Sequence, residues 1–407
     1  MRFPNFYGEW EVKKLGEVMD FKVTNSFSRE NLNYEYGTVK NIHYGDIHTK
    51  FQTLFDINYE SVPFINEEMD ISRISEENYC KNGDVIFADA SEDLNDVGKS
   101  IEIININEER LLSGLHTLLA RPKKDIFHLG FSGYLFKSNS VRTQIQKESQ
   151  GSKVLSINVG RISKIELSFP SVEEQKKISS FLALLDERIQ TQSKIIEQLE
   201  TLIKGLSENL FSQKIRFKKF EKKWEVKTLG EILIEINERT INSNQYRVLS
   251  STAKGLFYQS DYFNKEVASK DNAGYKILKI NQLVFSPQNL WLGNINVNTT
   301  YEIGIVSPSY KVFSFNEKAI VSYCKYFLKS SKMMFEYEQC SEQGASIVRR
   351  NLNMDLFLNI PILLPKLEEQ IQISSFLTKI DQKIQTEKAI LEQLEIQKKY
   401  LLQQMFV

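Results

Sequence analysis

Basic, amide and aromatic side chains recur in short polar stretches between the apolar runs of this 407-residue chain. In the first half they are Lys40, Asn41, His43, Tyr44, Lys99, Gln150, Ser152 and Lys153, and in the second half Lys254, Gln288, Asn289, Trp291, Ser346, Arg349 and Arg350. Lysine and arginine donate to phosphates and guanine edges, whereas asparagine and glutamine suit adenine edges. These loops are therefore candidates for contacts with double-stranded DNA.

Each of these positions can equally be read as a solvated loop residue. A recurring pair is stronger evidence than any single position, because Gln150 is followed by glycine and so is Gln343, each ahead of one long helical segment. Between the halves, the run QKIRFKKFEKKWEVK carries seven basic residues against two acids. Two interpretations of this run stay open, a solvated linker and a phosphate-contacting strip.

Familiar catalytic and metal-binding patterns are absent from the sequence. His43, His48, His116 and His128 have no metal-ligand spacing, and the chain has no HExxH, P-loop or GxGxxG. It also lacks an Asn/Asp-Pro-Pro-aromatic tetrapeptide for base methylation and a carboxylate-carboxylate-lysine cluster for Mg²⁺. We expect no cofactor, no metal and no catalytic site, and we interpret His116, in SGLHTLLA, as a core or strand residue.

Composition excludes several classes of protein. The formal net charge is zero, so any field that attracts a nucleic acid must be local. Three scattered cysteines, with no CxxC, argue against a disulfide framework and a thiolate metal site. The N-terminus lacks the apolar core of a signal peptide, and no apolar run could span a bilayer. We expect a cytoplasmic protein without a membrane partner.

The chain contains an internal duplication. RFPNFYGEWEVKKLGE, from Arg2, matches RFKKFEKKWEVKTLGE, from Arg216, and PSVEEQKKISSFLALLDERI, from Pro170, matches PKLEEQIQISSFLTKIDQKI, from Pro365. The part between the two motifs differs in length between the copies. The chain thus repeats one order of parts: a tryptophan motif, a variable domain and a long helix.

Each long helix carries a heptad pattern. The apolar seams run through Ile178, Leu182, Leu185, Ile189, Gln192, Ile196, Leu199, Ile203, Leu206 and Leu210, and through Ile373, Leu377, Ile380, Ile384, Glu387, Leu391, Leu394, Lys398, Leu401 and Met405. Such narrow stripes favour two helices that pack on each other, although packing on separate cores is the alternative. In an antiparallel pair, the polar positions Gln192 and Glu387 would meet and fix the register.

The variable parts contain short apolar runs bounded by turn residues, which predict strands. Gly83-Asp84 and Asn281-Gln282 are matching turns before matching strands, and a helix is expected around Val321 to Glu336. The fold class is therefore α+β, with two α/β domains separated by two long antiparallel coiled-coil helices in a pseudo-twofold duplication. The expected parts are a first domain at 1–169, a central helix at 170–213, a second domain at 214–364 and a C-terminal helix at 365–407.

These motifs resemble the specificity subunits of type I restriction-modification systems. The resemblance rests on W-E-V-K-x-L-G-E at Trp10 and Trp224, on P-x-x-E-E-Q at Pro170 and Pro365, and on the I-S-S-F-L that follows. VLSSTAKGLFYQSDYFNKEVASKD and FSPQNLWLG are also similar to one subtype of target-recognition domain. The acidic loop SEDLNDVGKS departs from the small, glycine-rich loop common at this position in the family.

The resemblance implies a DNA-binding subunit that reads a split target, with one recognition domain on each half-site. The helices would set the gap, since a seam of about 33 residues is roughly 50 Å long, or on the order of 15 base pairs. By resemblance, the partners are two modification subunits, which bind S-adenosylmethionine and methylate adenine, and ATP-dependent restriction subunits. Equivalent helices would offer equivalent docking faces to the two modification subunits.

Two other functions remain open from the sequence. A non-catalytic coiled-coil scaffold for protein–protein assembly would select no particular DNA sequence. A self-sufficient nuclease or methyltransferase would modify DNA unaided, although the absent motifs argue against it.

Overall fold

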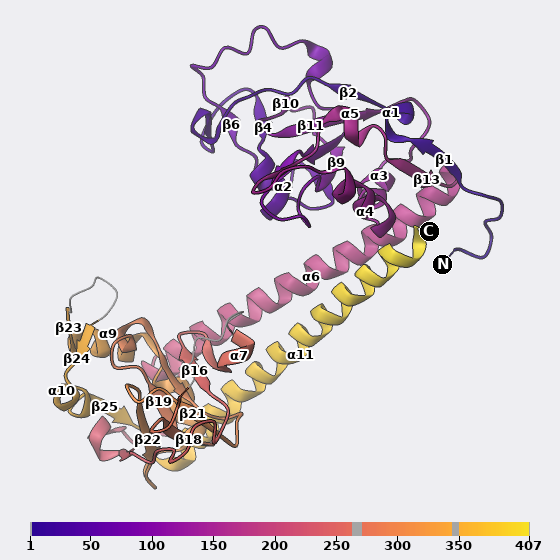
Figure 1. The fold of residues 1–407 in the computed structure, drawn as a ribbon. Helices are drawn as coiled ribbons and strands as arrows, with labels where there is room; N and C mark the ends of the chain where they lie inside the picture. Colours follow the sequence, from indigo (N-terminus) through magenta and orange to yellow (C-terminus); the bar gives the residue numbers. More distant parts are fainter. Residues whose placement is uncertain (1, 263–270, 344–349, 407) are drawn as a thin grey trace. The chain divides into compact units, whose positions relative to one another are not determined.

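The computed structural model describes residues 2–262, 271–343 and 350–406. The chain forms two compact units, the first from Met1–Ser193 with Ala389–Val407 and the second from Lys194–Lys388. Each unit combines an α+β domain with parts of two long helices, α6 (Val172–Phe211) and α11 (Leu367–Met405) (Figure 1).

The first unit is built on two larger sheets and two two-stranded ones, β1-β13 and β12-β8. A five-stranded sheet has the order β2-β11-β7-β9-β5, and a four-stranded sheet has the order β10-β4-β6-β3. The strands of the first unit are β1 (Glu11–Lys14), β2 (Met19–Lys22), β3 (Leu32–Asn33), β4 (Lys40–Ile42), β5 (Leu54–Asp56), β6 (Phe64–Ile65), β7 (Val85–Ala88), β8 (Ala90–Ser91), β9 (Ser100–Asn105), β10 (Leu111–Ser113), β11 (Thr117–Pro122), β12 (Leu155–Ser156) and β13 (Glu166–Phe169). Its shorter helices are α1 (Leu15–Val18), η1 (Arg29–Asn31), α2 (Tyr44–Thr49), η2 (Glu76–Asn78), α3 (Phe131–Leu135), α4 (Asn139–Glu148) and α5 (Val159–Ile162).

Strand β7 is buried on both faces of the larger sheet. Because successive side chains alternate, Val85 and Phe87 join the core that contains the helix residues, and Ile86 and Ala88 join the core under the smaller sheet. The core that contains Val85 and Phe87 also includes Leu182 of α6. The sheet is therefore the layer that fixes the domain to the helix.

The largest sheet of the second unit is smaller than that of the first. A four-stranded sheet has the order β15-β22-β19-β20, and the remaining strands form two-stranded pairs. Its strands are β14 (Glu225–Thr228), β15 (Leu233–Ile236), β16 (Leu249–Thr252), β17 (Gly255–Tyr258), β18 (Lys276–Lys279), β19 (Leu283–Phe285), β20 (Ile295–Val297), β21 (Ile303–Val306), β22 (Lys311–Phe315), β23 (Ser341–Gln343), β24 (Arg350–Leu352) and β25 (Pro361–Leu364). Its shorter helices are η3 (Leu229–Glu231), α7 (Gln259–Tyr262), η4 (Leu290–Leu292), α8 (Val321–Phe327), α9 (Ser331–Gln339) and α10 (Met354–Leu358).

The matching turns are confirmed. Gly83 (φ 91°) and Asn281 (φ 66°) both have left-handed backbone, and each precedes a buried strand, β7 or β19. The next residue in each turn accepts a hydrogen bond from a backbone N–H three positions back, Asp84 from Lys81 and Gln282 from Lys279. The turn chemistry is thus duplicated along with the strand.

The helix expected around Val321 to Glu336 is instead two helices, α8 and α9. Ser330 has extended backbone (φ −67°, ψ 154°), which breaks the helical path between them. The break allows Tyr323 of α8 and Met333 of α9 to enter the same core. Tertiary packing overrides the local helical pattern here.

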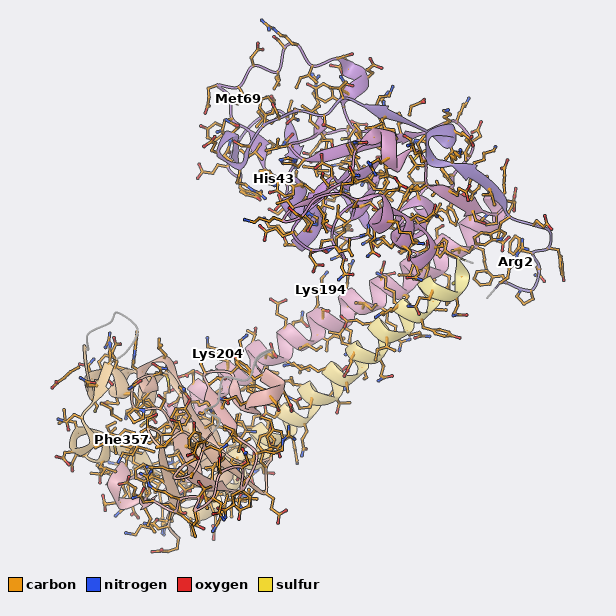
Figure 2. The ribbon with its side chains drawn as sticks, in the orientation of Figure 1. Arg2, His43, Met69, Lys194, Lys204 and Phe357 are labelled. Atoms are coloured by element: carbon orange, nitrogen blue, oxygen red, sulfur yellow. The ribbon has the colours of Figure 1, made fainter. Side chains whose placement is uncertain are left out.

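The long helices begin where the sequence indicates, two residues after Pro170 and Pro365. Every predicted seam position on both helices is buried or partly buried, whereas Lys194 and Lys204, off the seam of α6, are exposed (Figure 2). The heptad interpretation is therefore confirmed as a pattern of burial.

The two helices pack together in opposite directions within each unit. In the second unit, Glu200 pairs with Lys388 at 2.6 Å, while Leu210, further along α6, shares a core with Leu377, further back along α11. In the first unit, Asp186 of α6 pairs with Lys398 of α11. Beyond the end of α11, Phe406 is buried, with its ring 6.4 Å from that of Trp10 and 5.6 Å from that of Phe131.

Candidate nucleic-acid interface

A duplicated ion pair fixes each tryptophan motif to a long helix. In the first unit, Nε and Nη2 of Arg2 donate to the two carboxylate oxygens of Glu174 at 2.8 and 2.7 Å. In the second, Nε and Nη2 of Arg216 donate to those of Glu369 at 2.7 and 2.8 Å. Both carboxylates are almost fully buried, so these bidentate pairs are structural anchors.

The glutamine after each of these glutamates ties the domain to the start of its helix. Gln175 donates to the carbonyls of Pro170 and Ile126 and accepts from the backbone N–H of His128. Gln370 donates to the carbonyls of Pro365 and Lys318 and accepts from the N–H of Ile320. The recurring E-E-Q motif is therefore explained by packing between domain and helix.

A third repeated contact joins the domain helices to the long helices. The hydroxyl of Tyr134 donates to Asp186 at 2.9 Å, and the hydroxyl of Tyr326 donates to Asp381 at 2.7 Å. These tyrosines belong to Y-L-F-K-S and Y-F-L-K-S, a short recurring motif whose duplication is the sequence signal for this contact. Because all three anchors occur in both copies, the variable loops of each unit are attached to the long helices by the same set of contacts.

The lysine of the Y-L-F-K-S motif lies in an unusual environment. Lys137 is partly buried and donates to Oγ1 of Thr53 at 2.8 Å. Loss of hydration, together with nearby Lys398 and Lys99, lowers the pKa of Lys137 to about 7. Loss of hydration also lowers the pKa of Lys329, the equivalent lysine, which donates to Oδ1 of Asn296.

In the first unit, the structure gathers rings around Tyr44 at the start of α2. The Tyr44 ring lies 4.6 Å from that of His43, 5.9 Å from that of His48 and 5.4 Å from that of His116. Nδ1 of His116 lies 3.2 Å from Oδ1 of Asp89. We call these five residues the Tyr44 cluster (His43 is labelled in Figure 2).

His43 has a structural role within the cluster. It is buried, and its Nδ1 accepts from the backbone N–H of Gly45, which caps α2. Burial and the neighbouring Arg29 guanidinium lower its pKa, so the neutral imidazole that accepts this bond is favoured. The exposed member is His116, with half of its side chain accessible.

The other candidates of the first domain meet near this cluster. Nζ of Lys99 donates to the carbonyl of His48 at 2.6 Å and lies 3.6 Å from Asp96. The segment that carries Gln150, Ser152 and Lys153 is exposed, and it returns through β12, which pairs with β8 next to Asp89. The acidic loop between Ser91 and Lys99 therefore lies beside the cluster.

Two candidates of the first domain have other roles. Asn41 is fully buried, and its Oδ1 accepts from Asn25. Lys40 pairs with Glu109 at 2.6 Å and lies over the ring of Phe64. Burial removes Asn41 from direct contact with a ligand in this conformation, and Lys40 is already paired.

Three candidates of the second domain come together. The Arg350 guanidinium stacks on the Trp291 ring at 4.2 Å and pairs with Glu338 at 3.1 Å. Its backbone N–H donates to the carbonyl of Gln288, whose side chain is exposed. Oδ1 of the adjacent Asn289 is buried and has no hydrogen-bond partner among the described residues.

The remaining candidates of the second domain lie apart or outside the described residues. Ser346 and Arg349 fall in 344–349, which the structure does not describe. Lys254, in the β16–β17 turn, lines a cleft of about 540 Å³ together with Lys329 and Asp381. The glycine of the second Gln-Gly pair, Gly344, also lies outside the described residues.

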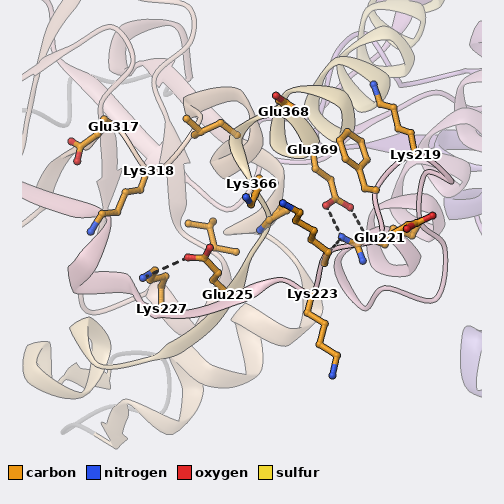
Figure 3. Close-up of a pocket in the computed structure, with 16 residues that line it drawn as sticks. Lys219, Glu221, Lys223, Glu225, Lys227, Glu317, Lys318, Lys366, Glu368 and Glu369 are labelled. Atoms are coloured by element: carbon orange, nitrogen blue, oxygen red, sulfur yellow. Dashed lines mark hydrogen bonds and ion pairs between the residues drawn. The ribbon is translucent and has the colours of Figure 1, made fainter.

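The basic run between the halves lines a pocket of about 770 Å³ at the start of α11 (Figure 3). Lys219, Lys222 and Lys223 contribute to it, but five glutamates do so as well, and Lys227 lies near Glu225 at 3.7 Å. The first copy has Asn5, Gly8 and Glu9 at the aligned positions of those three lysines. A phosphate-contacting role for this run stays a prediction.

Among the described residues, no group of three or more histidine, cysteine, aspartate or glutamate side chains is placed to hold a metal ion. No helix within that part of the chain is both long and apolar enough to cross a membrane. The interface candidates are thus polar and aromatic loops.

Comparison with known proteins identifies the family. Residues 7–201 and 221–396 each match the type I restriction modification DNA specificity domain. A Methanocaldococcus jannaschii protein described as a type I restriction enzyme MjaX specificity subunit is 25% identical over 97% of this chain and 92% of its own. The MjaVIII specificity subunit of the same organism is 26% identical over 75% of each chain.

Solved structures share the fold. The S subunit of a type I restriction-modification system from M. genitalium superposes with a TM-score of 0.54 at 15% identity, over 100% of this chain and 98% of that one. A chain from a study of the assembly and conformational transition of the type I R-M system gives 0.59 at 14% identity, over 99% and 98%. With two matched domains, each attached to the long helices by the same anchors, this chain belongs to the type I restriction-modification DNA specificity family.

Proposed function

We propose that this chain reads a split DNA target for a type I restriction-modification complex, with each unit contacting one half-site. The observation that carries the proposal is that the anchors are the same in both units while the loop surfaces are not. The three anchors, headed by Arg2–Glu174 and Arg216–Glu369, recur in both units, whereas the surfaces differ. A protein that reads two different half-sites needs two different binding surfaces that are attached to the helices in the same way.

The candidate surfaces carry suitable chemistry. In the first unit, the Tyr44 cluster, Lys99 and the exposed Gln150, Ser152 and Lys153 offer rings, donors and acceptors. In the second, Gln288, Trp291 and Arg350 offer an amide, an indole and a guanidinium. These groups suit base edges and phosphates in the major groove.

We further propose that α6 and α11 set the gap and dock two modification subunits. Forty residues of α6 correspond to a rod of roughly 60 Å. Off-seam apolar residues such as Leu184 (65% exposed) and Ile371 (53% exposed) offer surface for a partner helix. The duplication gives two equivalent partners equivalent contacts.

Catalysis is assigned to those partners: methylation to the modification subunits, and ATP-dependent translocation and cleavage to the restriction subunits. The motifs of nucleases and methyltransferases are absent from the sequence, and the family is one of specificity subunits. We place the protein in the cytoplasm, where DNA is accessible and its three free thiols stay reduced.

A binding selection tests the proposal. The chain, assembled with the modification subunits of its own system, is incubated with random duplexes, and the bound fraction is sequenced. We expect a two-part consensus with a fixed gap, and exchange of residues 16–169 for those of another family member should change one half only. Exchange of 230–364 is the matched control and should change the other half.

A scaffold for protein–protein assembly would give a different result. It would enrich no duplex, and neither exchange would have an effect. Mapping methylated adenines in a genome that carries the system provides an independent readout, because each modified site must fit the selected consensus.

A further inference from the structure

We propose that His116 reads an exocyclic amino group of a base in the first half-site, with Asp89 as its positioning residue. This inference rests on the proposed function and names one contact within it. The acceptor is Nε2 of the imidazole, and its chemical target is the N6 amino group of adenine or the N4 amino group of cytosine.

The backbone at His116 is held in a rare conformation. Its φ of 55° lies in the left-handed region, which a non-glycine residue adopts only when its surroundings enforce it. Asp89 supplies that enforcement from two sides, since its N–H donates to the His116 carbonyl at 3.0 Å and its Oδ1 meets Nδ1. Strained residues that are clamped in this way concentrate at functional sites.

The contact with Asp89 also sets which ring nitrogen is free. A carboxylate accepts only, so Nδ1 must carry the proton, and Nε2 of the neutral ring then has a lone pair. In the major groove, adenine and cytosine each present an amino donor, whereas guanine and thymine present oxygen acceptors there. The neutral imidazole therefore favours the two amino bases.

His116 differs from its neighbours in the cluster. Nδ1 of His43 accepts from Gly45, and Nε2 of His48 lies 3.1 Å from the carbonyl of Ala90, so both rings serve the fold. The His116 side chain is 51% exposed and stands edge-on to Tyr44, with an interplanar angle of 77°. Tyr44 thus limits how the ring can turn without covering it.

The surrounding loops provide further contacts for a duplex. Lys99 donates to the carbonyl of His48 and so supports the cluster, whereas Lys153 is exposed on the segment that returns beside β8. A cation near a base-reading side chain can bind the flanking phosphate, which fixes the register of the duplex. The reading atom and a lysine suited to the flanking phosphate therefore lie on neighbouring loops of one domain.

Glycine substitution gives a test that spares the backbone. His116→Gly removes the ring but keeps access to positive φ. In the binding selection, the assembled complex should lose discrimination roughly ten-fold at one position of the first half-site. The second half-site and the gap should be unchanged.

Asn107→Gly is the matched control, because Asn107 is an exposed residue of the same domain with φ of 47°. It should leave the consensus intact. Asp89→Asn should relax the same position as His116→Gly, since an amide accepts or donates and no longer fixes the imidazole proton. A merely structural role for Asp89 predicts a uniform loss of affinity, with base preferences retained.

The outcomes separate this inference from the proposed function. A wild-type complex that selects no split consensus contradicts both. A split consensus that His116→Gly leaves unchanged at every position overturns only the role of His116. A split consensus that Asp89→Asn relaxes at another position than His116→Gly overturns the pairing of the two residues in one contact.

Discussion

At the scale of single residues, several buried charged groups lie where each domain meets its long helices. Lys137 has lost much of its hydration there, and Glu174 and Glu369 are nearly buried but paired. Removing a charge from water is costly unless a partner compensates for it. Substitutions at this junction should therefore change stability strongly.

Lys137→Met should remove a pH dependence of folding. The pKa of Lys137 is about 7 in the folded chain, below its ordinary value near 10.5. Between pH 7 and 10.5 the unfolded chain binds a proton at this amine that the folded chain does not bind. The contribution of Lys137 to the free energy of unfolding is therefore fully present above pH 10.5 and is lost as the pH falls towards 7. Urea unfolding should show the wild type gaining roughly 3 kcal/mol between pH 7 and 9.5, and the variant gaining less.

Lys147→Met is the control for that experiment, since Lys147 is an exposed residue of the neighbouring helix α4. Its unfolding free energy should follow the wild type at each pH. Equal slopes for all three proteins would show that Lys137 is well hydrated.

Arg216→Met should destabilise the second unit by roughly 3 kcal/mol, because it leaves the buried Glu369 carboxylate unpaired. Adding Glu369→Gln should restore part of this loss. A double-mutant cycle in urea measures the coupling free energy of the pair. Additive effects of the two substitutions would contradict the anchor assigned to it.

At the scale of elements, our proposal gives the long helices the role of spacer between the two half-sites. The buried seam of each helix contains a polar residue, Gln192 in α6 and Glu387 in α11. Both polar side chains are buried, and that they specify the register of the helices at some cost in stability stays a prediction. The proposed spacer role can therefore be tested by changing helix length in whole heptads.

Insertion of one heptad at equivalent positions in α6 and α11 should lengthen the gap between half-sites by about 10 Å, or roughly three base pairs. The binding selection measures the gap directly, and the two half-site sequences should be unchanged. A control insertion in α6 alone should break the match between the seams and lower stability. An unchanged gap after the double insertion would contradict the spacer role.

Features encoded by local spacing could be predicted from the sequence. The heptads, the helix starts after Pro170 and Pro365 and the turns at Gly83 and Asn281 each follow from nearby residues. The break between α8 and α9 was missed, because it depends on core packing.

The sites depended on contacts distant in sequence. Arg2 meets Glu174 across 172 positions, and His116 meets Asp89 across 27, so the types of neighbouring residues gave no signal. The duplication did carry one, since Arg-Phe and Glu-Glu-Gln recur together, and this joint recurrence indicates that they touch. His116 lacks a counterpart of this kind and was interpreted as a core or strand residue.

At the scale of the whole molecule, the duplication attaches two different domains to the long helices by the same anchors. The family is one of specificity subunits, and our proposal assigns methylation and cleavage to other chains. The purified chain should therefore leave DNA unmodified when supplied with S-adenosylmethionine or Mg²⁺. Adding the modification subunits should produce methylated adenine, measured by mass spectrometry of digested DNA.

Modification by the chain alone would contradict that division of roles. A preparation of His116→Gly serves as a further control, because it should still support methylation, at a broader set of sites. A complete loss of methylation in that variant would instead indicate a failure of assembly.

The burial of Phe406 against Trp10 and Phe131 has a consequence for synthesis. Residues 1–193 leave the ribosome with a gap in their core that the last turn of α11 must fill. At about 5–20 residues per second, translating the intervening 195 residues takes on the order of 10–40 s. Throughout that interval, the apolar residues of the first domain that pack on the end of α11 lack this part of their core.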